Sequence, residues 1–264
     1  MNPKDYKTIS VTRRGRVIIL SLNRPEALNA VNGEMHEELS RVFIDAQDDK
    51  ESDIVMITGS GKAFSAGGDI GWLKSMTANT AEFDIVRAHG KRIIFSMLDC
   101  EKPIVAKING PAVGLGCTIA LFSDIIFAAE DAVISDPHVS VGLVAGDGGA
   151  VIWPQLIGYA RAKEYLMTGK RLSGSKAAEI GLVNHAVPTG ELDAAVDAFC
   201  DDLLAGALLA IKYTKVSINI SLKQLAHSIL DTSLAYETIT NRSKDHLTAV
   251  TAFVNREKPT FTGE

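Results

Sequence analysis

The stretch PIVAKINGPAVGLGCTIAL (residues 103–121) decides the fold class of this chain of 264 residues. Its first part, PIVAKIN (103–109), is a short, mostly apolar run, as expected of a strand buried within a parallel sheet. A loop with glycines follows, and GLGCTIALFS (114–123) is then predicted as a helix. A strand, a loop and a helix in that order indicate an α/β fold with right-handed crossovers.

A second stretch has the same form. In MITGSGKAFSAGGDIGWLK (56–74), a loop with glycines follows the buried strand DIVMITG (53–59). Glycines let the backbone approach a ligand closely, and N–H groups at a helix start have no partner within the helix. Two such N–H groups that converge on one point would form an oxyanion hole. The alternative is that these glycines only allow close helix packing.

The remaining pattern extends this α/β core. A β-hairpin is predicted to turn near Arg14 and Gly15, and residues 33–49 and 82–99 are predicted as helices. Residues 124–136 are predicted as a pair of strands, and after about residue 148 the pattern is helical almost throughout. We therefore expect a core domain over residues 1–200 and a helical region over residues 201–264.

Composition narrows the classes of partner. The formal net charge is −5, and no run of Lys or Arg exceeds a pair, so we expect no nucleic-acid partner. The apolar runs are far shorter than a membrane span, so no membrane partner is expected. The three cysteines lack CxxC spacing, which argues against a zinc site and favours a reducing, cytoplasmic compartment. Small molecules or copies of the same chain remain as partners.

Three short motifs resemble known binding or catalytic motifs but depart from them in residue type, in spacing or in the element that follows. GSGKAF (59–64) has Ala63 where a phosphate loop needs a hydroxyl, and GLGCTI (114–119) lacks the third glycine of a dinucleotide fingerprint. AFSAG (63–67) resembles a serine elbow, but no helix follows Ser65 directly.

Five segments taken together resemble the crotonase (enoyl-CoA hydratase/isomerase) superfamily. They are RPEALNAV (24–31), GSGKAFSAGGDI (59–70), the long run at 102–143, MTGKRLSGSKAAEIGLVNHAV (167–187) and TAFVNREKPTF (251–261). The resemblance implies a spiral of ββα units with a helical C-terminal trimerisation region, assembled as a homotrimer or homohexamer. It also implies an acyl-CoA substrate, with no cofactor beyond the coenzyme A that the substrate carries.

The resemblance also places a binding site. The oxyanion of the thioester would be held by the backbone N–H groups of Gly68 and Leu115. The acyl-CoA substrate would contact the two loops and the helix that follows the first loop, and its coenzyme A phosphates would lie near the C-terminus. The residues expected at these contacts are Phe64, Ala66, Asp69, Ile70, Trp72, Gly114 and Lys258.

The expected catalytic residues depart from those of the family's hydratases. Those enzymes use two glutamates, and the matching positions here carry Thr118 and His138. Imidazole can exchange protons near neutral pH, so His138 is the strongest candidate acid or base. Several relatives carry a catalytic aspartate where this chain has Gly146. Asp147 is therefore either a displaced catalytic group or a cap for the following helix.

These residues leave three functions open. The first is an acyl-CoA-processing enzyme that stabilises a thioester enolate, with Thr118 and His138 in place of the usual glutamates. The second is a thioesterase, or a hydrolase or lyase of C–C bonds, that uses His138 and Asp147. The third is an inert coenzyme A-binding protein. Fold alone does not decide among them.

Overall fold

A computed structural model describes the backbone of residues 1–264 and the side chains of all except residues 78 and 80–82. Its main sheet has the strand order β1-β2-β3-β4-β6-β9, and a smaller sheet has the order β5-β7-β8. The main strands are β1 (Ile9–Arg14), β2 (Val17–Leu22), β3 (Ile54–Gly59), β4 (Ile104–Ile108), β6 (Ile125–Ala129) and β9 (His185–Val187). The smaller sheet contains β5 (Ala112–Val113), β7 (Val133–Ser135) and β8 (Leu172–Ser173).

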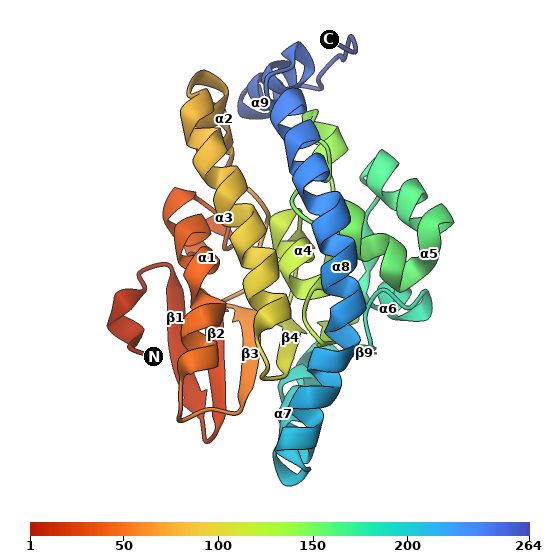
Figure 1. Ribbon diagram of the computed structural model, residues 1–264. Helices are drawn as coiled ribbons and strands as arrows, with labels where there is room; N and C mark the ends of the chain where they lie inside the picture. Colours follow the sequence, from red (N-terminus) through yellow and green to blue (C-terminus); the bar gives the residue numbers. More distant parts are fainter.

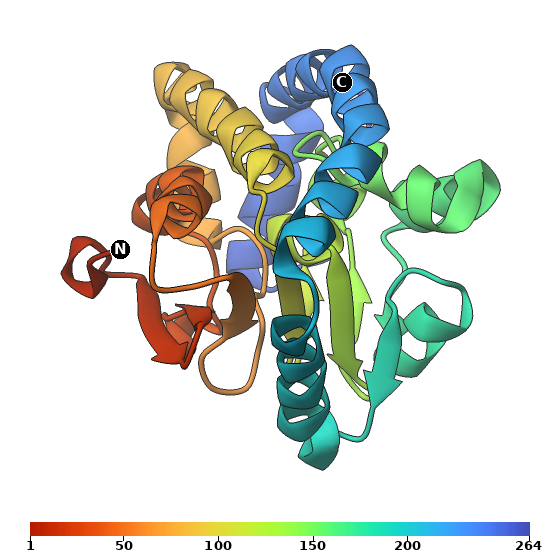
Figure 2. The ribbon, with the colours of Figure 1, turned by 60° about the horizontal axis from the view of Figure 1, so that its bottom comes forward.

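Helices surround these sheets. They are α1 (Gly33–Asp48), α2 (Ile70–Ala78), α3 (Thr80–Asp99), α4 (Leu115–Leu121), α5 (Gly149–Thr168), α6 (Gly174–Glu179), α7 (Leu192–Ala205), α8 (Leu208–Asn241) and α9 (Lys244–Asn255). A short 3-10 helix, η3 (His138–Val141), lies between β7 and α5. Figures 1 and 2 show α1, α3 and α8 side by side over one face of the main sheet. The α/β fold expected from the sequence is confirmed.

The hairpin and the buried strands form where their patterns predict them. β1 pairs antiparallel with β2, and Arg14 faces Val17 across a turn in which Gly15 has a φ of 56°. That positive φ suits glycine, because it has no Cβ. β2, β3, β4, β6 and β9 are joined by parallel pairings, and every residue of β3 is buried. A strand covered on both faces has no polar side to display, which explains its uninterrupted apolar sequence.

Two details differ from the sequence prediction. The strands predicted within residues 124–136 form, but β6 joins the main sheet while β7 joins β5 and β8. The second half also contains β8 and β9, which have two and three residues. Strands this short leave no alternation to detect, so the helical pattern around them dominated the prediction.

The C-terminal part begins with a helix that belongs to the core. The expected division at residue 200 falls inside α7, which packs against β4 and β6. α8 starts after Gly206 and packs against α3 and α5. Among the described residues, no helix combines the length and the apolar character needed to cross a membrane.

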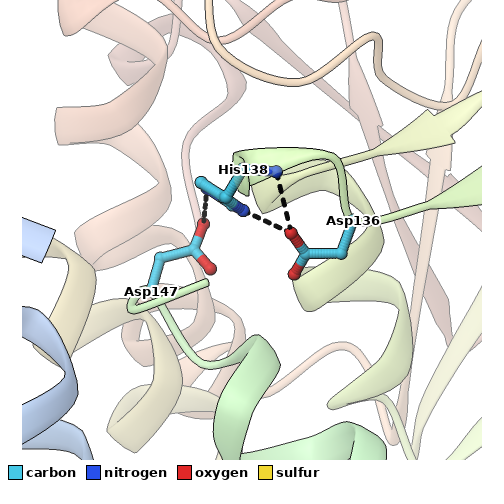
Figure 3. Close-up of side chains that lie close together, drawn as sticks. All are labelled: Asp136, His138 and Asp147. Atoms are coloured by element: carbon cyan, nitrogen blue, oxygen red, sulfur yellow. Dashed lines mark hydrogen bonds and ion pairs between the residues drawn. The ribbon is translucent and has the colours of Figure 1, made fainter. Parts of the chain in front are cut away.

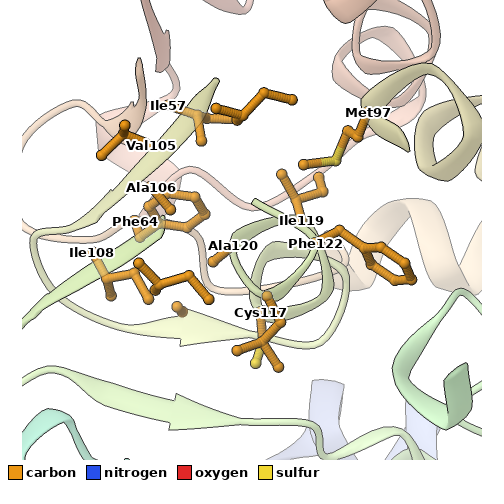
Figure 4. Close-up of a cluster of buried hydrophobic side chains, with 14 of the residues drawn as sticks. Ile57, Phe64, Met97, Val105, Ala106, Ile108, Cys117, Ile119, Ala120 and Phe122 are labelled. Carbon is orange, nitrogen blue, oxygen red and sulfur yellow. The ribbon is translucent and has the colours of Figure 1, made fainter. Parts of the chain in front are cut away.

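The hydrophobic core lies between the main sheet and the helices. Figure 4 shows Ile57, Val105, Ala106 and Ile108 from β3 and β4 beside α4 residues such as Ile119 and Ala120. All seven residues of α4 are buried. The start of α4 is thus fixed by the core, which matters because it belongs to the candidate site.

The two faces of α1 give a matched test of this packing. Leu39 is fully buried, whereas the Ile44 side chain is 45% exposed on the same helix. We expect Leu39→Ala to lower the free energy of unfolding by about 2–5 kcal/mol, because it leaves a cavity in a close-packed core. Ile44→Ala should change it by less than about 0.5 kcal/mol. Urea denaturation of both variants measures the difference, and equal losses would contradict the burial of Leu39.

Candidate active site

The two glycine loops recognised in the sequence meet in space. Ser65 of the first loop forms a parallel bridge with Ala112 of the second. A Cβ added to Gly114 would lie 3.8 Å from the Gly67 Cα atom, and one added to Gly116 would lie 2.5 Å from the Ser65 Cβ atom. The second distance is too short for any side chain. Glycine at residue 116 therefore allows the loops to cross closely.

Several backbone N–H groups at this crossing are bonded: the Gly67 N–H to Ser65 Oγ, the Asp69 N–H to the Val31 carbonyl, and the Gly114 N–H to the Ser135 carbonyl. Gly68 and the first residues of α4, Leu115 among them, have N–H groups without an acceptor among the described residues. Leu115 is the first residue of α4, where no preceding turn can supply an acceptor.

The polar residues of the first loop hold its shape. The Ser65 hydroxyl donates to the Asn29 carbonyl at 2.8 Å and is fully buried, so the serine-elbow motif has a structural role. Asp69 caps α2, because its carboxylate accepts from the N–H groups of Gly71 and Trp72 at 3.0 and 3.3 Å. Arg24 donates to the other oxygen of the same carboxylate.

Beside the crossing, one imidazole lies between two carboxylates (Figure 3). His138 Nδ1 bonds to Asp136 Oδ1, and His138 Nε2 lies 3.4 Å from Asp147 Oδ2. The His138 N–H also donates to Asp136 Oδ1, at 3.4 Å. Only Pro137 separates Asp136 from His138 in the sequence, so the turn at Pro137 brings the Asp136 carboxylate to the His138 ring.

The three predicted catalytic residues are joined in one group. The Thr118 hydroxyl donates to Asp147 Oδ1 at 3.1 Å, and the other oxygen of that carboxylate faces His138. Thr118 is fully buried and the His138 side chain is 12% exposed. The cap position of α5 is Gly148 rather than Asp147, although the N–H of Gly149 stabilises the Asp147 carboxylate.

In this arrangement the pKa of His138 is higher than the ordinary imidazole value that the sequence alone suggests. Burial alone would lower its pKa, but the charges of Asp136 and Asp147 and the hydrogen bonds to both raise the pKa well above its usual value. Burial would raise the pKa of Asp147, yet His138, Thr118 and the Gly149 N–H together lower it. The two carboxylates therefore favour the protonated, imidazolium form of His138.

The imidazole also touches the loop crossing. A Cβ on Gly114 would lie 3.7 Å from His138 Cε1 as well as near Gly67, so the ring sits next to both loops. Helix α9 fixes the segment from the other side. His246 Nδ1 donates to the Val141 carbonyl at 2.6 Å, and Gly142 lies directly against the backbone of His246.

Asp69 and Gly114 belong to the two loops described above, and the other five predicted substrate-contacting residues fall into three groups. Phe64 is fully buried in the hydrophobic core (Figure 4), so its side chain supports the loop from beneath. Ala66, Ile70 and Trp72 are half-buried along the first loop and α2. Lys258 is exposed in the tail after α9, and no described contact joins it to the other site residues.

Sequence reasoning missed three polar residues around this site. Asp136 is the first, and its place two residues before His138 in the order D-P-H is the one local signal that could have found it. His36 of α1 is buried, and its ring lies 5.4 Å from that of Trp72. Glu237 of α8 is buried and interacts with the charges of Asp147, His138 and Asp136. The last two come from distant helices, and no local signal marks them.

The same cluster could be mistaken for a metal site. One ligand atom from each of Asp136, His138 and Asp147 lies within 4.8 Å of the others. However, the ring separates the carboxylates and turns a different nitrogen toward each (Figure 3). Ligands of one ion converge on a common point. The geometry is that of groups sharing protons.

Comparisons with known proteins agree with this architecture. The sequence model of the enoyl-CoA hydratase/isomerase family matches residues 12–264. A short-chain-enoyl-CoA hydratase of Clostridium acetobutylicum is 32% identical over 259 residues, which cover 96% of this chain and 97% of the relative.

Two solved structures are also similar. An enoyl-CoA hydratase/isomerase of Mycobacterium paratuberculosis is 41% identical, with a TM-score of 0.88 and coverage of 94% of this chain and 99% of that one. A β-diketone hydrolase of the cyanobacterium Anabaena, bound to (S)-3-oxocyclohexyl acetic acid, is 29% identical, with a TM-score of 0.84 and coverage of 90% and 96%. The chain therefore belongs to the enoyl-CoA hydratase/isomerase family and has the fold of the crotonase superfamily.

Proposed function

We propose that this protein converts acyl-CoA thioesters through an enolate, and that the Asp136–His138–Asp147 group carries out the proton transfer. The observation that carries the proposal is the position of this group beside the two N–H groups without acceptors, those of Gly68 and Leu115. The family's usual pair of glutamates is replaced by Thr118 and His138. The group around His138 is thus the source of acid and base.

The two N–H groups would receive the thioester oxygen. Removing a proton next to the carbonyl builds negative charge on that oxygen, and fixed backbone dipoles stabilise this charge without reorganising. One such donor typically contributes about 100- to 1,000-fold in rate. Because the backbone supplies both donors, the side chain of Leu115 shapes the pocket without removing the donor.

The residues of the Asp136–His138–Asp147 group have different roles in the proton transfers. Asp136 holds His138 Nδ1, which fixes the ring and leaves Nε2–H directed toward Asp147 and the site. The Asp147 carboxylate, oriented by Thr118, accepts a proton as the base. The imidazolium returns a proton to the enolate carbon or to a leaving group.

A second candidate reaction is the hydrolysis of a C–C bond between two carbonyl groups. The similarity to the β-diketone hydrolase of Anabaena favours it, as does the ion pair between His138 and Asp147. In this reaction Asp147 takes a proton from water, and the hydroxide adds to one carbonyl. The C–C bond then breaks, and its electrons form an enolate that the two N–H groups hold. His138 finally protonates the enolate carbon.

Assembly and coenzyme A binding belong to the same proposal. The last two helices carry exposed apolar side chains, as expected of a trimerisation surface: Tyr213, Ile218, Ile220, Tyr236, Ile239, Leu247 and Phe253. We propose a homotrimer or homohexamer, and we assign Lys258 to the coenzyme A phosphates. The three cysteines are free and buried, which is consistent with a reducing cytoplasm.

His138→Ala should lower kcat by at least about 100-fold, because the site loses its proton donor. The exposed His227 gives a matched control, and His227→Ala should leave kcat within about twofold. Steady-state kinetics and the melting temperature of each variant test this. A His138→Ala enzyme with wild-type kcat would remove His138 from the mechanism.

Asp147→Asn should lower the pKa of His138, since one of the two charges that raise it is lost. In the wild type the pKa of folded His138 lies above that of unfolded histidine. Its stabilisation is therefore complete below the unfolded value of about 6.5 and is lost as pH rises through the folded value. NMR titration of the His138 ring in both proteins measures the shift. An unchanged pKa in Asp147→Asn would rule out the ion pair.

Three assays separate the candidate reactions. Loss of enoyl-thioester absorbance reports hydration, release of free thiol reports thioester hydrolysis, and loss of β-diketone absorbance reports C–C cleavage. We expect activity that depends on His138 in the enolate reactions of acyl-CoA or in C–C cleavage. Tight coenzyme A binding without turnover in any assay would favour an inert binding protein.

A further inference from the structure

A buried carboxyl group from the C-terminal helix lies beside the candidate active site. Glu237 stands near the end of α8, far along the chain from the two glycine loops, and it is only 8% exposed. A Cβ added to Gly146 would lie 2.6 Å from Glu237 Oε2 and 2.7 Å from its Cβ atom. The Glu237 side chain is thus packed directly against the turn that carries Asp147.

The turn is also tied to α8 by other contacts. The Val144 N–H donates to Thr240 Oγ1 at 3.2 Å, and the added Gly146 Cβ would lie 2.7 Å from the Ser233 carbonyl oxygen. No side chain fits at residue 146 while α8 lies here. Residue 146 is the position at which the resemblance expected an acidic side chain, and Glu237 brings a carboxyl group from another element into that space.

The charges around Glu237 disfavour its ionisation. Among the described residues, three charged groups act on it: Asp147 from the turn before α5, His138 from η3, and Asp136 from the end of β7. Burial and the negative charge of Asp147 raise the pKa of Glu237 to about 8, and His138 opposes them only in part. This pKa favours the uncharged acid form of Glu237 at neutral pH, beside the Asp136 and Asp147 carboxylates and the His138 ring.

We propose that Glu237 is a positioning residue of the active site, and that its bound proton keeps a third negative charge away from the His138–Asp147 pair. This inference rests on the proposed role of that pair in proton transfer. When Glu237 ionises, the added negative charge binds the His138 proton more tightly, so the imidazolium becomes a weaker donor. The C-terminal helix in this way sets the upper pH limit of the reaction.

The test compares kcat as a function of pH in three variants. The wild type should lose kcat as pH rises through about 8. In Glu237→Gln this limb should be absent, and kcat at neutral pH should fall by less than about tenfold, because the amide stays neutral but alters the packing against Gly146. Glu237→Asp, which keeps an acid, should retain the limb. Glu191→Gln, at an exposed glutamate, should match the wild type.

A readout without substrate separates this inference from the proposed function. A buried acid whose folded pKa exceeds its unfolded value destabilises the protein as pH rises between the two values. The melting temperature of Glu237→Gln relative to the wild type should therefore increase from about pH 6 to about pH 8. This difference persists even if no acyl-CoA substrate is turned over.

Three results would overturn the inference. One is a constant difference in melting temperature over this pH range. Another is an unchanged alkaline limb in Glu237→Gln. The third is a loss of more than about 100-fold in kcat at neutral pH with an intact fold, since that would mean the carboxyl group itself reacts. If Glu237→Gln does not fold, infrared spectra of the wild type decide: a protonated-carboxyl band must be present at neutral pH and disappear near pH 8.

Discussion

The arrangement around the site depends on one imidazole that two buried carboxylates hold from opposite sides. Asp136 binds His138 Nδ1 and Asp147 faces Nε2, so each ring nitrogen has a carboxylate partner. A buried ion pair is retained only when its remaining polar atoms find partners. Here Thr118 supplies one for Asp147, whereas Oδ2 of Asp136 has no hydrogen-bond partner among the described residues. The candidate proton donor and the candidate base thus lie side by side.

The two glycine loops bring backbone N–H groups to the side of this ring. Their crossing at Gly67 and Gly114 brings two N–H groups without acceptors next to the ring. Because α4 is wholly buried, the N–H at its start is fixed by the hydrophobic core and needs no polar side chain to hold it.

The C-terminal helices are part of the site as well as candidates for assembly. α9 binds η3 through His246, and α8 places Glu237 and Thr240 against the turn that carries Asp147. The packing of α8 on the turn that carries Asp147 couples the two regions, because neither can shift without exposing the buried carboxyl groups of Asp147 and Glu237. Apolar side chains elsewhere on α8 and α9, such as Ile218 and Phe253, are exposed in the single chain.

The sequence by itself predicted the α/β class, the hairpin, the buried strands β3 and β4 and the two glycine loops, since each rests on local periodicity or on glycine placement. It also singled out Thr118, His138 and Asp147, because their segments carry the family resemblance. Only the tertiary structure showed that these three residues form one hydrogen-bonded group and that Asp136 completes it. It alone placed Glu237 and His36 at the site, from helices remote in the chain. The direction of each pKa shift likewise depends on burial and on nearby charges. Folding creates both by bringing together residues that are distant in the sequence, so local sequence patterns do not predict them.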